Sequence, residues 1–431
     1  MSGTTPSALA MLERIGEPEA LAGDSAVTDT DVDWPINAHI HLPPNFSAFN
    51  TIEQAVDIAA GQGLVALGTS NYYDYRIYNH FAARARDRGI FPLFGIEIIA
   101  MIDDLRREQV KLNDPGNPGK VYLCGKGITR FDPLSDRALS LLDTIRRNDS
   151  QRMAAMIDAM RNVLARRGLG INLDEDAIID RIVRRHGCER SSVYLQERHV
   201  AQAFQEAIFE ATPQPQRIDM LTRLMGASTK VQDPDDAVTV QNELRTHLMK
   251  AGRPAFIEET FVTYEHARDL ILALGGIPCY PVLVDGASPI GAFETPVDDF
   301  IERLKQLDLH AAEFIPTRNA AGTLREYVPA LRRAGFIVTA GTEHNTLDMI
   351  PLRPACAGGE PIPDEVEAIF REGACIVAAH QYLRSRGEGG YVDDRGRLVA
   401  DGEAEPEARR AELARLGAAV IRAWRSGRGE A

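Results

Sequence analysis

Cysteine is scarce in this sequence, and its copies follow no regular spacing. The five residues stand at Cys124, Cys188, Cys279, Cys356 and Cys375, and none forms a CxxC pair. An odd and scattered set argues against a disulfide framework. A reducing compartment is therefore the simpler expectation.

Long apolar runs are also missing. No run approaches the ~20 residues that a membrane-spanning helix needs, so we expect a soluble protein. Residues 1–31 lack the basic start and the long apolar centre of a signal peptide, and their acidic residues argue against a transit peptide. These observations predict a cytoplasmic protein.

Positively charged residues are fewer than negatively charged ones. The sequence has 48 Lys and Arg against 62 Asp and Glu, a formal net charge of -14. Nucleic-acid binding depends on clustered Lys and Arg, so this balance argues against a polymer of nucleic acid as the partner. We expect a small anionic substrate and no membrane, and the composition leaves the oligomeric state open.

What is present is an alternation of short apolar runs with helix-like stretches, and it predicts an α/β fold. Residues 36–132 follow this pattern, which predicts parallel strands. Residues 133–254 carry apolar residues at helical spacing and predict a helical insertion. The β/α pattern returns over residues 255–385. Residues 1–35 form an N-terminal extension, and residues 386–431 a turn-rich segment with a final helix at about 406–425.

The first candidate for chemistry is the sequence His39-Ile40-His41, at the end of an apolar run. Side chains of a strand alternate between its two faces, so both histidines point the same way and Ile40 points to the other layer. Two imidazoles on one face make half of a metal site. The alternative is one satisfied core histidine and one loop histidine.

Carboxylates stand at the ends of later strand candidates, where β/α barrels place their active-site residues. Glu97 interrupts the apolar run 94–99, and a carboxylate there must be paired, protonated or bound to a cation. Glu343 and His344 follow the run 336–340 in the same way. A salt-bridged strand residue and a solvated loop pair are the alternatives.

The order of these motifs resembles the PHP (polymerase and histidinol phosphatase) superfamily, and in particular its stand-alone phosphoesterases. The resemblance extends over about residues 36–345 and rests on five segments: His39-Ile40-His41, Gly95-Ile96-Glu97, Glu197 to Phe204, Gly275 to Pro278, and Val338 to His344. It implies a distorted seven-stranded (β/α)7 barrel with a helical insertion. It also implies divalent metal ions such as manganese, zinc or iron, and phosphoester hydrolysis.

The sequence departs from that pattern at several metal positions. Gly68-Thr69-Ser70-Asn71-Tyr72-Tyr73 stands where the family has an Asp-His pair, and Tyr122 and Tyr280 stand where it has histidines. Tyrosine is a poor substitute for imidazole as a metal ligand. We therefore expect fewer than three ions, held by His39, His41, Glu97 and Glu343. A role in catalysis is predicted for Tyr280 and His344.

Cationic and polar residues near the predicted strand ends are candidates for substrate binding, because guanidinium and ammonium groups bind anions. They are Lys126, Arg198, His199, Arg318 and Asn319. An ordinary solvated surface charge is the alternative for each cation. His380 is expected to be a buried helix histidine.

Three functions follow from this sequence. The first is a metal-dependent hydrolase, a phosphoesterase acting on a small anion such as a sugar or nucleotide phosphate. The second is an isomerase or lyase acting on a sugar or sugar acid. The third is an inactive PHP protein that binds a ligand. Metal content separates the first two from the third.

Overall fold

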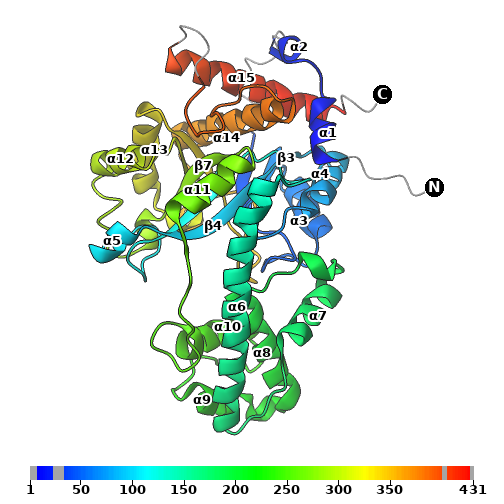
Figure 1. Cartoon of the computed structure of the whole chain (residues 1–431), viewed down its shortest axis with the longest axis vertical. Coiled ribbons are helices and arrows are strands. Elements are labelled where there is room, and N and C mark those ends of the chain that lie inside the picture. Colours follow the sequence, from blue (N-terminus) through cyan, green and yellow to red (C-terminus); the bar gives the residue numbers. More distant parts are fainter. Residues whose placement is uncertain (1–6, 23–33, 400–404, 428–431) are drawn as a thin grey trace, which may run out of the picture.

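A long helix, α6, joins the two parts of the molecule (Figure 1). The computed structural model describes residues 7–22, 34–399 and 405–427. Helix α6 (Asp136–Arg166) has 31 residues and so spans about 46 Å at 1.5 Å per residue. It begins where the hydroxyl of Ser135 accepts a hydrogen bond from the amide of Ala138, which satisfies a donor left free at the helix start. Parts of the predicted terminal segments, 1–35 and 386–431, lie outside the described residues.

The strands form two sheets. The first has three parallel strands in the order β1-β2-β3, and the second has six strands in the order β6-β4-β5-β7-β8-β9. Their bounds are β1 Ile36–Ile40, β2 Ala66–Thr69, β3 Phe91–Leu93, β4 Gly95–Met101, β5 Lys120–Lys126, β6 Val262–Thr263, β7 Ile277–Val282, β8 Ala311–Phe314 and β9 Ile337–Ala340.

Two isolated β-bridges connect the two sheets. Ile40, at the end of β1, bridges to Glu343 after β9, and Asn71, after β2, bridges to Ile96 of β4. The hydrogen bonding therefore shows a mixed α/β fold of two linked sheets, and a closed seven-stranded barrel stays a prediction.

The expectation of parallel strands is wrong for β5. This strand runs antiparallel to both β4 and β7. The segment 102–119 between β4 and β5 contains only the short helix α5 (Asp103–Arg107), so the chain turns back along its neighbour. A parallel pairing usually has a crossover helix that carries the chain back along the sheet, and the 5 residues of α5 are too short to do so.

Helices pack around the sheets, and the last two helices of the chain lie at the end of the molecule away from the helical lobe (Figure 1). Their bounds are α1 Ala8–Glu13, α2 Pro18–Ala22, α3 Ile52–Gly61, α4 Ile77–Asp87, α11 Tyr264–Ala273, α12 Val297–Gln306, α13 Ala321–Arg333, α14 Asp364–Ser385 and α15 Pro406–Arg425. Helix α15 matches the predicted final helix. His380 of α14 is buried, with Nε2 2.9 Å from the carbonyl of Gly275, as expected.

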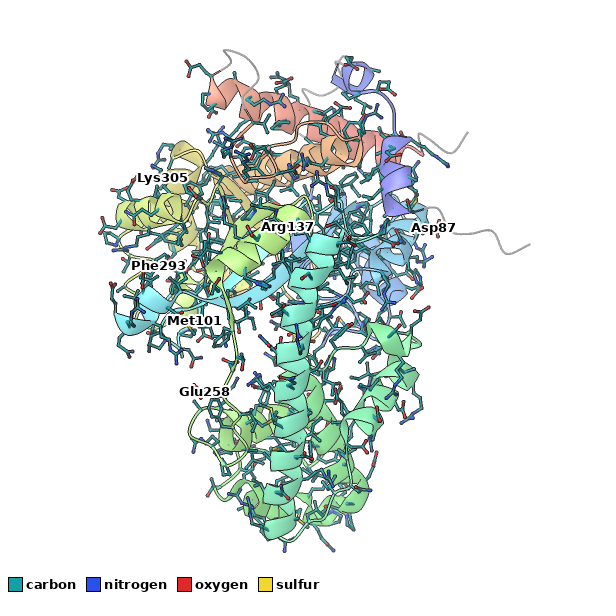
Figure 2. All side chains as sticks on the ribbon, viewed as in Figure 1. Asp87, Met101, Arg137, Glu258, Phe293 and Lys305 are labelled. Carbon is teal, nitrogen blue, oxygen red and sulfur yellow. The ribbon has the colours of Figure 1, made fainter. Side chains whose placement is uncertain are left out.

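The helical lobe has a hydrophobic core of its own. It contains the far part of α6 and helices α7 (Glu175–His186), α8 (Glu197–Ala211), α9 (Arg217–Met225) and α10 (Ala237–Leu244), followed by η4 (Arg245–Met249). Buried Met156, Phe204 and Leu224 belong to this core and not to the core around the sheets. Figure 2 shows the lobe's two connections, with Arg137 at the sheet end of α6 and Glu258 on the segment that returns to the sheets.

No helix within the described ranges combines the length and the apolar character needed to cross a membrane.

Candidate metal centre

Three predicted ligands meet at the carboxyl end of β1. His39 and His41 lie on the same face of the strand end, and their Nε2 atoms are 3.4 Å apart. Glu97 on β4 places Oε2 3.2 Å from Nε2 of His41. One ligand atom from each of the three residues lies within 4.8 Å of the others, and all three are buried. The expected convergence of these side chains is therefore present.

The spacing of these atoms fits a single small cation. Ligand bonds of about 2.0–2.1 Å in a tetrahedral site place neighbouring donor atoms about 3.3–3.4 Å apart. The two printed separations, 3.4 Å between the histidines and 3.2 Å between His41 and Glu97, are close to that value. Nδ1 of His41 is also buried and has no hydrogen-bond partner among the described residues. The donor set, two imidazoles and one carboxylate, suits zinc, manganese or iron.

Glu313 of β8 fixes the orientation of His39. Its Oε2 lies 2.6 Å from Nδ1 of His39, and its Oε1 lies 2.6 Å from Nζ of Lys126. Burial raises the pKa of Glu313, but the charge of Lys126 and the hydrogen bonds from His39 and Lys126 outweigh it and hold the pKa below 4.5. An ionised carboxylate only accepts hydrogen bonds, so Nδ1 of His39 carries the proton and donates it. Nε2 of His39 is then free to bind a cation.

Glu97 is held as a carboxylate by its surroundings. Burial acts to raise its pKa, but a hydrogen bond from His41 and the electrostatic influence of the two neighbouring histidine rings lower it to about 2. Tyr72 adds a hydrogen bond to Glu97, and its ring stacks on His41 with centroids 5.2 Å apart. Tyr72 therefore positions two of the three ligands at once. Burial and the charge of Glu97 raise the pKa of Tyr72 well above 10, so its hydroxyl stays protonated.

Cys124 forms a second group with His39 and Glu313. Burial raises the pKa of its thiol well above 9, and a metal ligand must be the thiolate. Glu313 is already shared between His39 and Lys126. The His39, His41 and Glu97 group is the better donor set.

Gly341, the residue that follows strand β9, lies very close to His39. A Cβ placed on Gly341 would lie 2.3 Å from the Cβ of His39, so only glycine fits there. The next residues turn sharply, with φ of 60° at Glu343 and 52° at His344. This turn decides where the predicted Glu343 and His344 side chains go.

We call His39, His41 and Glu97 the ligand group. Glu343 and His344 are not part of it. The carboxylate of Glu343 is held by the guanidinium of Arg318, with Nη1 2.8 Å from Oε1, and by Nδ2 of Asn345 at 2.8 Å. Nδ1 of His344 lies 2.8 Å from Oγ1 of Thr342, and its Nε2 lies 3.0 Å from the carbonyl of Ile350. Both ring nitrogens are occupied, so His344 has no lone pair free for a metal or a substrate proton.

Three further residues that the sequence predicted for the site are buried, and they do not line the polar cavity that is described below. Lys126 is buried, and its ammonium is paired with Glu313. Asn319 is fully buried and donates to the carbonyl of Ile315 at 3.0 Å. The ring of Tyr280 packs against Phe293 and Phe300 on the opposite side of β7. Because residues of one strand alternate between two faces, the position that resembles a ligand carries its side chain into the core.

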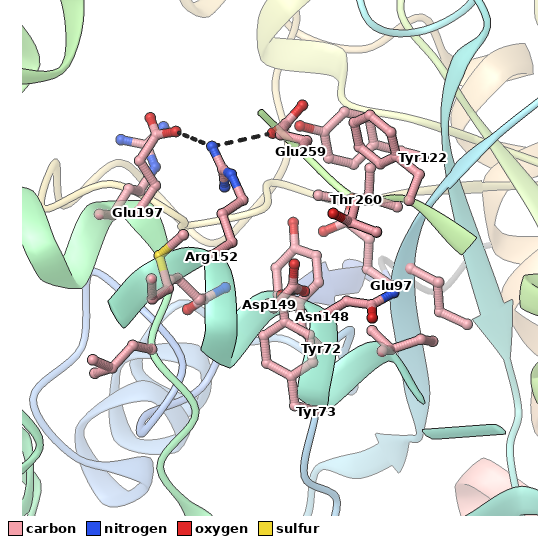
Figure 3. Close-up of a pocket in the computed structure, with 18 of the residues that line it drawn as sticks. Tyr72, Tyr73, Glu97, Tyr122, Asn148, Asp149, Arg152, Glu197, Glu259 and Thr260 are labelled. Atoms are coloured by element: carbon pink, nitrogen blue, oxygen red, sulfur yellow. Dashed lines mark hydrogen bonds and ion pairs between the residues drawn. The ribbon is translucent and has the colours of Figure 1, made fainter. Parts of the chain in front are cut away.

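A polar cavity lies between the ligand group and the helical lobe (Figure 3). Arg152 of α6 pairs there with Glu197 at 3.3 Å and with Glu259 at 3.6 Å. The hydroxyl of Tyr73 donates to Asp149 at 2.5 Å. Glu97 and Tyr122 line the sheet side of the same cavity.

Of the two predicted residues on α8, only Arg198 lines this cavity. Its guanidinium lies over the ring of Phe46, 6.0 Å from the ring centre. His199 accepts a hydrogen bond from the amide of Gln196 at 3.1 Å and caps the helix. Burial lowers the pKa of His199 to about 3, so it stays neutral. Its position indicates a structural role.

Sequence reasoning missed two residues of the site. Glu313 lies within the apolar run Ala311–Phe314, and a carboxylate in a buried strand was the signal that marked Glu97. Tyr72 carried no such signal, since a tyrosine before a helix is ordinary.

Two solved structures resemble this chain at low sequence identity. No family model matches the chain, and no curated protein matches it. An amidohydrolase from Chromobacterium violaceum, solved with bound sulfate and no metal, is 17% identical, with 78% of this chain and 96% of that chain covered and a TM-score of 0.48. A candidate metal-dependent phosphoesterase from Bifidobacterium adolescentis is 14% identical, with 78% and 95% covered and a TM-score of 0.49. Likeness at this level leaves the family of this chain unassigned.

Proposed function

We propose that this protein is a metal-dependent hydrolase that acts on a small anionic phosphoester. The observation that carries the proposal is the buried convergence of His39, His41 and Glu97, with ligand atoms within 4.8 Å of one another. A divalent ion held there would lower the pKa of a bound water and polarise a substrate oxygen.

The chain's own residues prepare this site in three ways. Glu313 fixes the tautomer of His39, so that Nε2 faces the site. Tyr72 orders His41 and Glu97 through a stacked ring and a hydrogen bond. Arg198 supplies a positive charge on the cavity wall, which binds the substrate's anion and holds its reacting atom near the ligand group.

We further propose that the chain is a PHP-like protein in which the two sheets act as a distorted (β/α)7 barrel. The order of the motifs along the chain supports this, and so do the bridges from Ile40 to Glu343 and from Asn71 to Ile96. The proposed divisions are 36–132 and 255–385 for the barrel and 133–254 for the insertion. One ion is proposed, because Arg318 occupies Glu343.

Turnover with defined metals tests this function. Purified protein is stripped with a chelator and reloaded with zinc, manganese or iron. It is then assayed for phosphate release from sugar phosphates, nucleotides and aryl phosphates, and for nitrophenol release from bis(4-nitrophenyl) phosphate. His41→Ala should lose both bound metal and turnover, because it removes a ligand shared by the whole group. His266→Ala is the matched control, since His266 lies on α11 with Nε2 against the carbonyl of Leu141. Turnover that survives in metal-free His41→Ala protein would contradict the proposal.

A further inference from the structure

Two cavities adjoin the candidate metal centre and share a wall. The first, of about 150 Å³, extends towards the helical lobe and is called the helical chamber. The second, of about 360 Å³, lies between the end of β7 and the segment after β9 and is called the strand chamber. Six residues line both chambers: Tyr72, Glu97, Tyr122, Arg198, Arg245 and Asn345. The ligand Glu97 therefore faces both.

The charged groups that line only one chamber already have partners. In the helical chamber, Lys120 lies 2.9 Å from Glu259. In the strand chamber, the guanidinium of Arg318 holds the carboxylate of Glu343. Apart from the shared wall, the described lining of neither chamber offers an unpaired charge to a highly charged ligand. Their lining favours uncharged polar substituents.

Arg198, on the shared wall, is different. Within the part of the chain that the structure describes, no carboxylate lies within ion-pair distance of its guanidinium, whereas its neighbour Arg245 is paired with Glu197 at 2.9 Å. Burial, and then the charge of Arg245, lower the pKa of Arg198 to about 10. A partly buried cation without a counter-ion is costly, and a bound anion removes that cost. The wall between the chambers is therefore a place for one negative charge.

We propose that the substrate lies across both chambers, with a single negative charge against Arg198 and one substituent in each chamber. This inference rests on the proposed metal-dependent hydrolase and specifies the form of its substrate. A carboxylate as the recognised group would replace the phosphoester of that proposal. A phosphodiester has this form, since its one charge lies between two substituents. A substrate with a carboxylate next to its scissile amide also carries one negative charge, on a side branch of the molecule. A terminal monoester, by contrast, leaves one chamber empty and brings a second charge for which the described lining offers no unpaired side-chain cation.

Binding to metal-free protein tests the inference without turnover. Titration calorimetry compares the extended monoanions bis(4-nitrophenyl) phosphate and hippuryl-phenylalanine with the terminal monoester 4-nitrophenyl phosphate. Asn148→Trp fills the helical chamber and Thr346→Trp fills the strand chamber, and neither residue belongs to the ligand group. Asn148→Ala and Thr346→Ala are the matched size controls, and each should weaken binding less than its tryptophan counterpart because it adds no bulk.

The expected pattern has three parts. At least one extended anion binds more tightly than the monoester, and which one does so identifies phosphate or carboxylate as the recognised group. Each tryptophan variant weakens that binding by about tenfold or more, because bulk in either chamber displaces a substituent. Arg198→Gln weakens it by about 10- to 100-fold, the usual effect of losing a charge-assisted hydrogen bond.

Other results overturn the inference. They are tighter binding of the monoester than of both extended anions, or an effect of one tryptophan variant alone. Zinc uptake, measured after the same preparations are reloaded with zinc, reports on the proposed function separately. The expected binding pattern in protein that takes up no zinc would support binding across both chambers and contradict the hydrolase.

Discussion

Replacing Glu313 with glutamine should destabilise the fold and weaken metal binding together. The carboxylate is fully buried and contacts three groups: Nδ1 of His39 and Nζ of Lys126, each at 2.6 Å, and Oγ1 of Thr339 at 3.2 Å. Glu313→Gln keeps the shape and removes the charge. It leaves the ammonium of Lys126 buried without a counter-ion.

The magnitude follows from burial. Removing one partner of a buried ion pair costs about 3–5 kcal/mol of the free energy of unfolding, because the remaining charge is uncompensated. The same change takes away the anionic partner of His39. Loss of such a partner weakens metal binding by about 10- to 100-fold, or about 1.4–2.7 kcal/mol.

A double-mutant cycle separates the two effects. Lys126→Met removes the other charge, so Glu313→Gln/Lys126→Met leaves no unpaired charge in the core. The double variant should regain most of the lost stability, measured by urea unfolding. Its zinc affinity, measured by competition with a chelator, should stay low, since an amide still faces His39.

The result that would refute this reasoning is specific. If Glu313→Gln unfolds at the urea concentration of the unmodified protein and binds zinc equally well, Glu313 neither supports the fold nor orients His39. If the double variant recovers zinc affinity along with stability, the effect of Glu313 on the metal is only structural.

Three other expectations concern residues around the site. Tyr72→Phe should reduce zinc affinity by a few fold and retain the ring that stacks on His41, because only the hydrogen bond to Glu97 is lost; an unchanged affinity in the chelator competition would contradict it. Burial outweighs two backbone hydrogen bonds and raises the pKa of Glu294 from 4.5 to about 7. The protonated Glu294 side chain therefore contributes stability that is fully present below pH 4.5 and is lost as the pH rises through 7. The loss is on the order of 3 kcal/mol, and Glu294→Gln should flatten the stability profile between pH 4.5 and 7; an equally steep profile in the variant would refute this. Tyr280→Phe should leave the turnover of the metal-loaded enzyme within about twofold, because the ring lies in the core between Phe293 and Phe300; a loss of tenfold or more with unchanged stability would restore its predicted catalytic role.

The sequence predicts His39, His41 and Glu97 as candidate ligands because the signals that mark them are local. The alternation of a strand places His39 and His41 on one face, and the carboxylate of Glu97 interrupts an apolar run. Neither inference needs knowledge of the tertiary fold. The helix at Pro406–Arg425 is likewise a local pattern, and its bounds agree with the structure.

The remaining site depends on contacts between distant segments. Arg318 reaches Glu343 only because η6 (Pro316–Arg318) and the turn after β9 lie side by side. Lys126 meets Glu313 across two strands that are 187 positions apart in sequence, counting from 126 to 313. The sequence alone does not distinguish a cation at a strand end that faces solvent from one that faces a substrate or a buried carboxylate. Pairing of this kind is decided by the assembled fold.

The most direct test of the account is the position of a bound metal. A crystal of the protein grown with zinc, measured at the zinc absorption edge, should show one anomalous peak per chain. The peak should lie about 2.0–2.2 Å from a nitrogen of His39, a nitrogen of His41 and a carboxylate oxygen of Glu97. Zinc content in solution should then be one per chain and should vanish in His41→Ala. A fully folded protein that takes up no divalent ion, or one that binds it away from these three residues, would contradict the account.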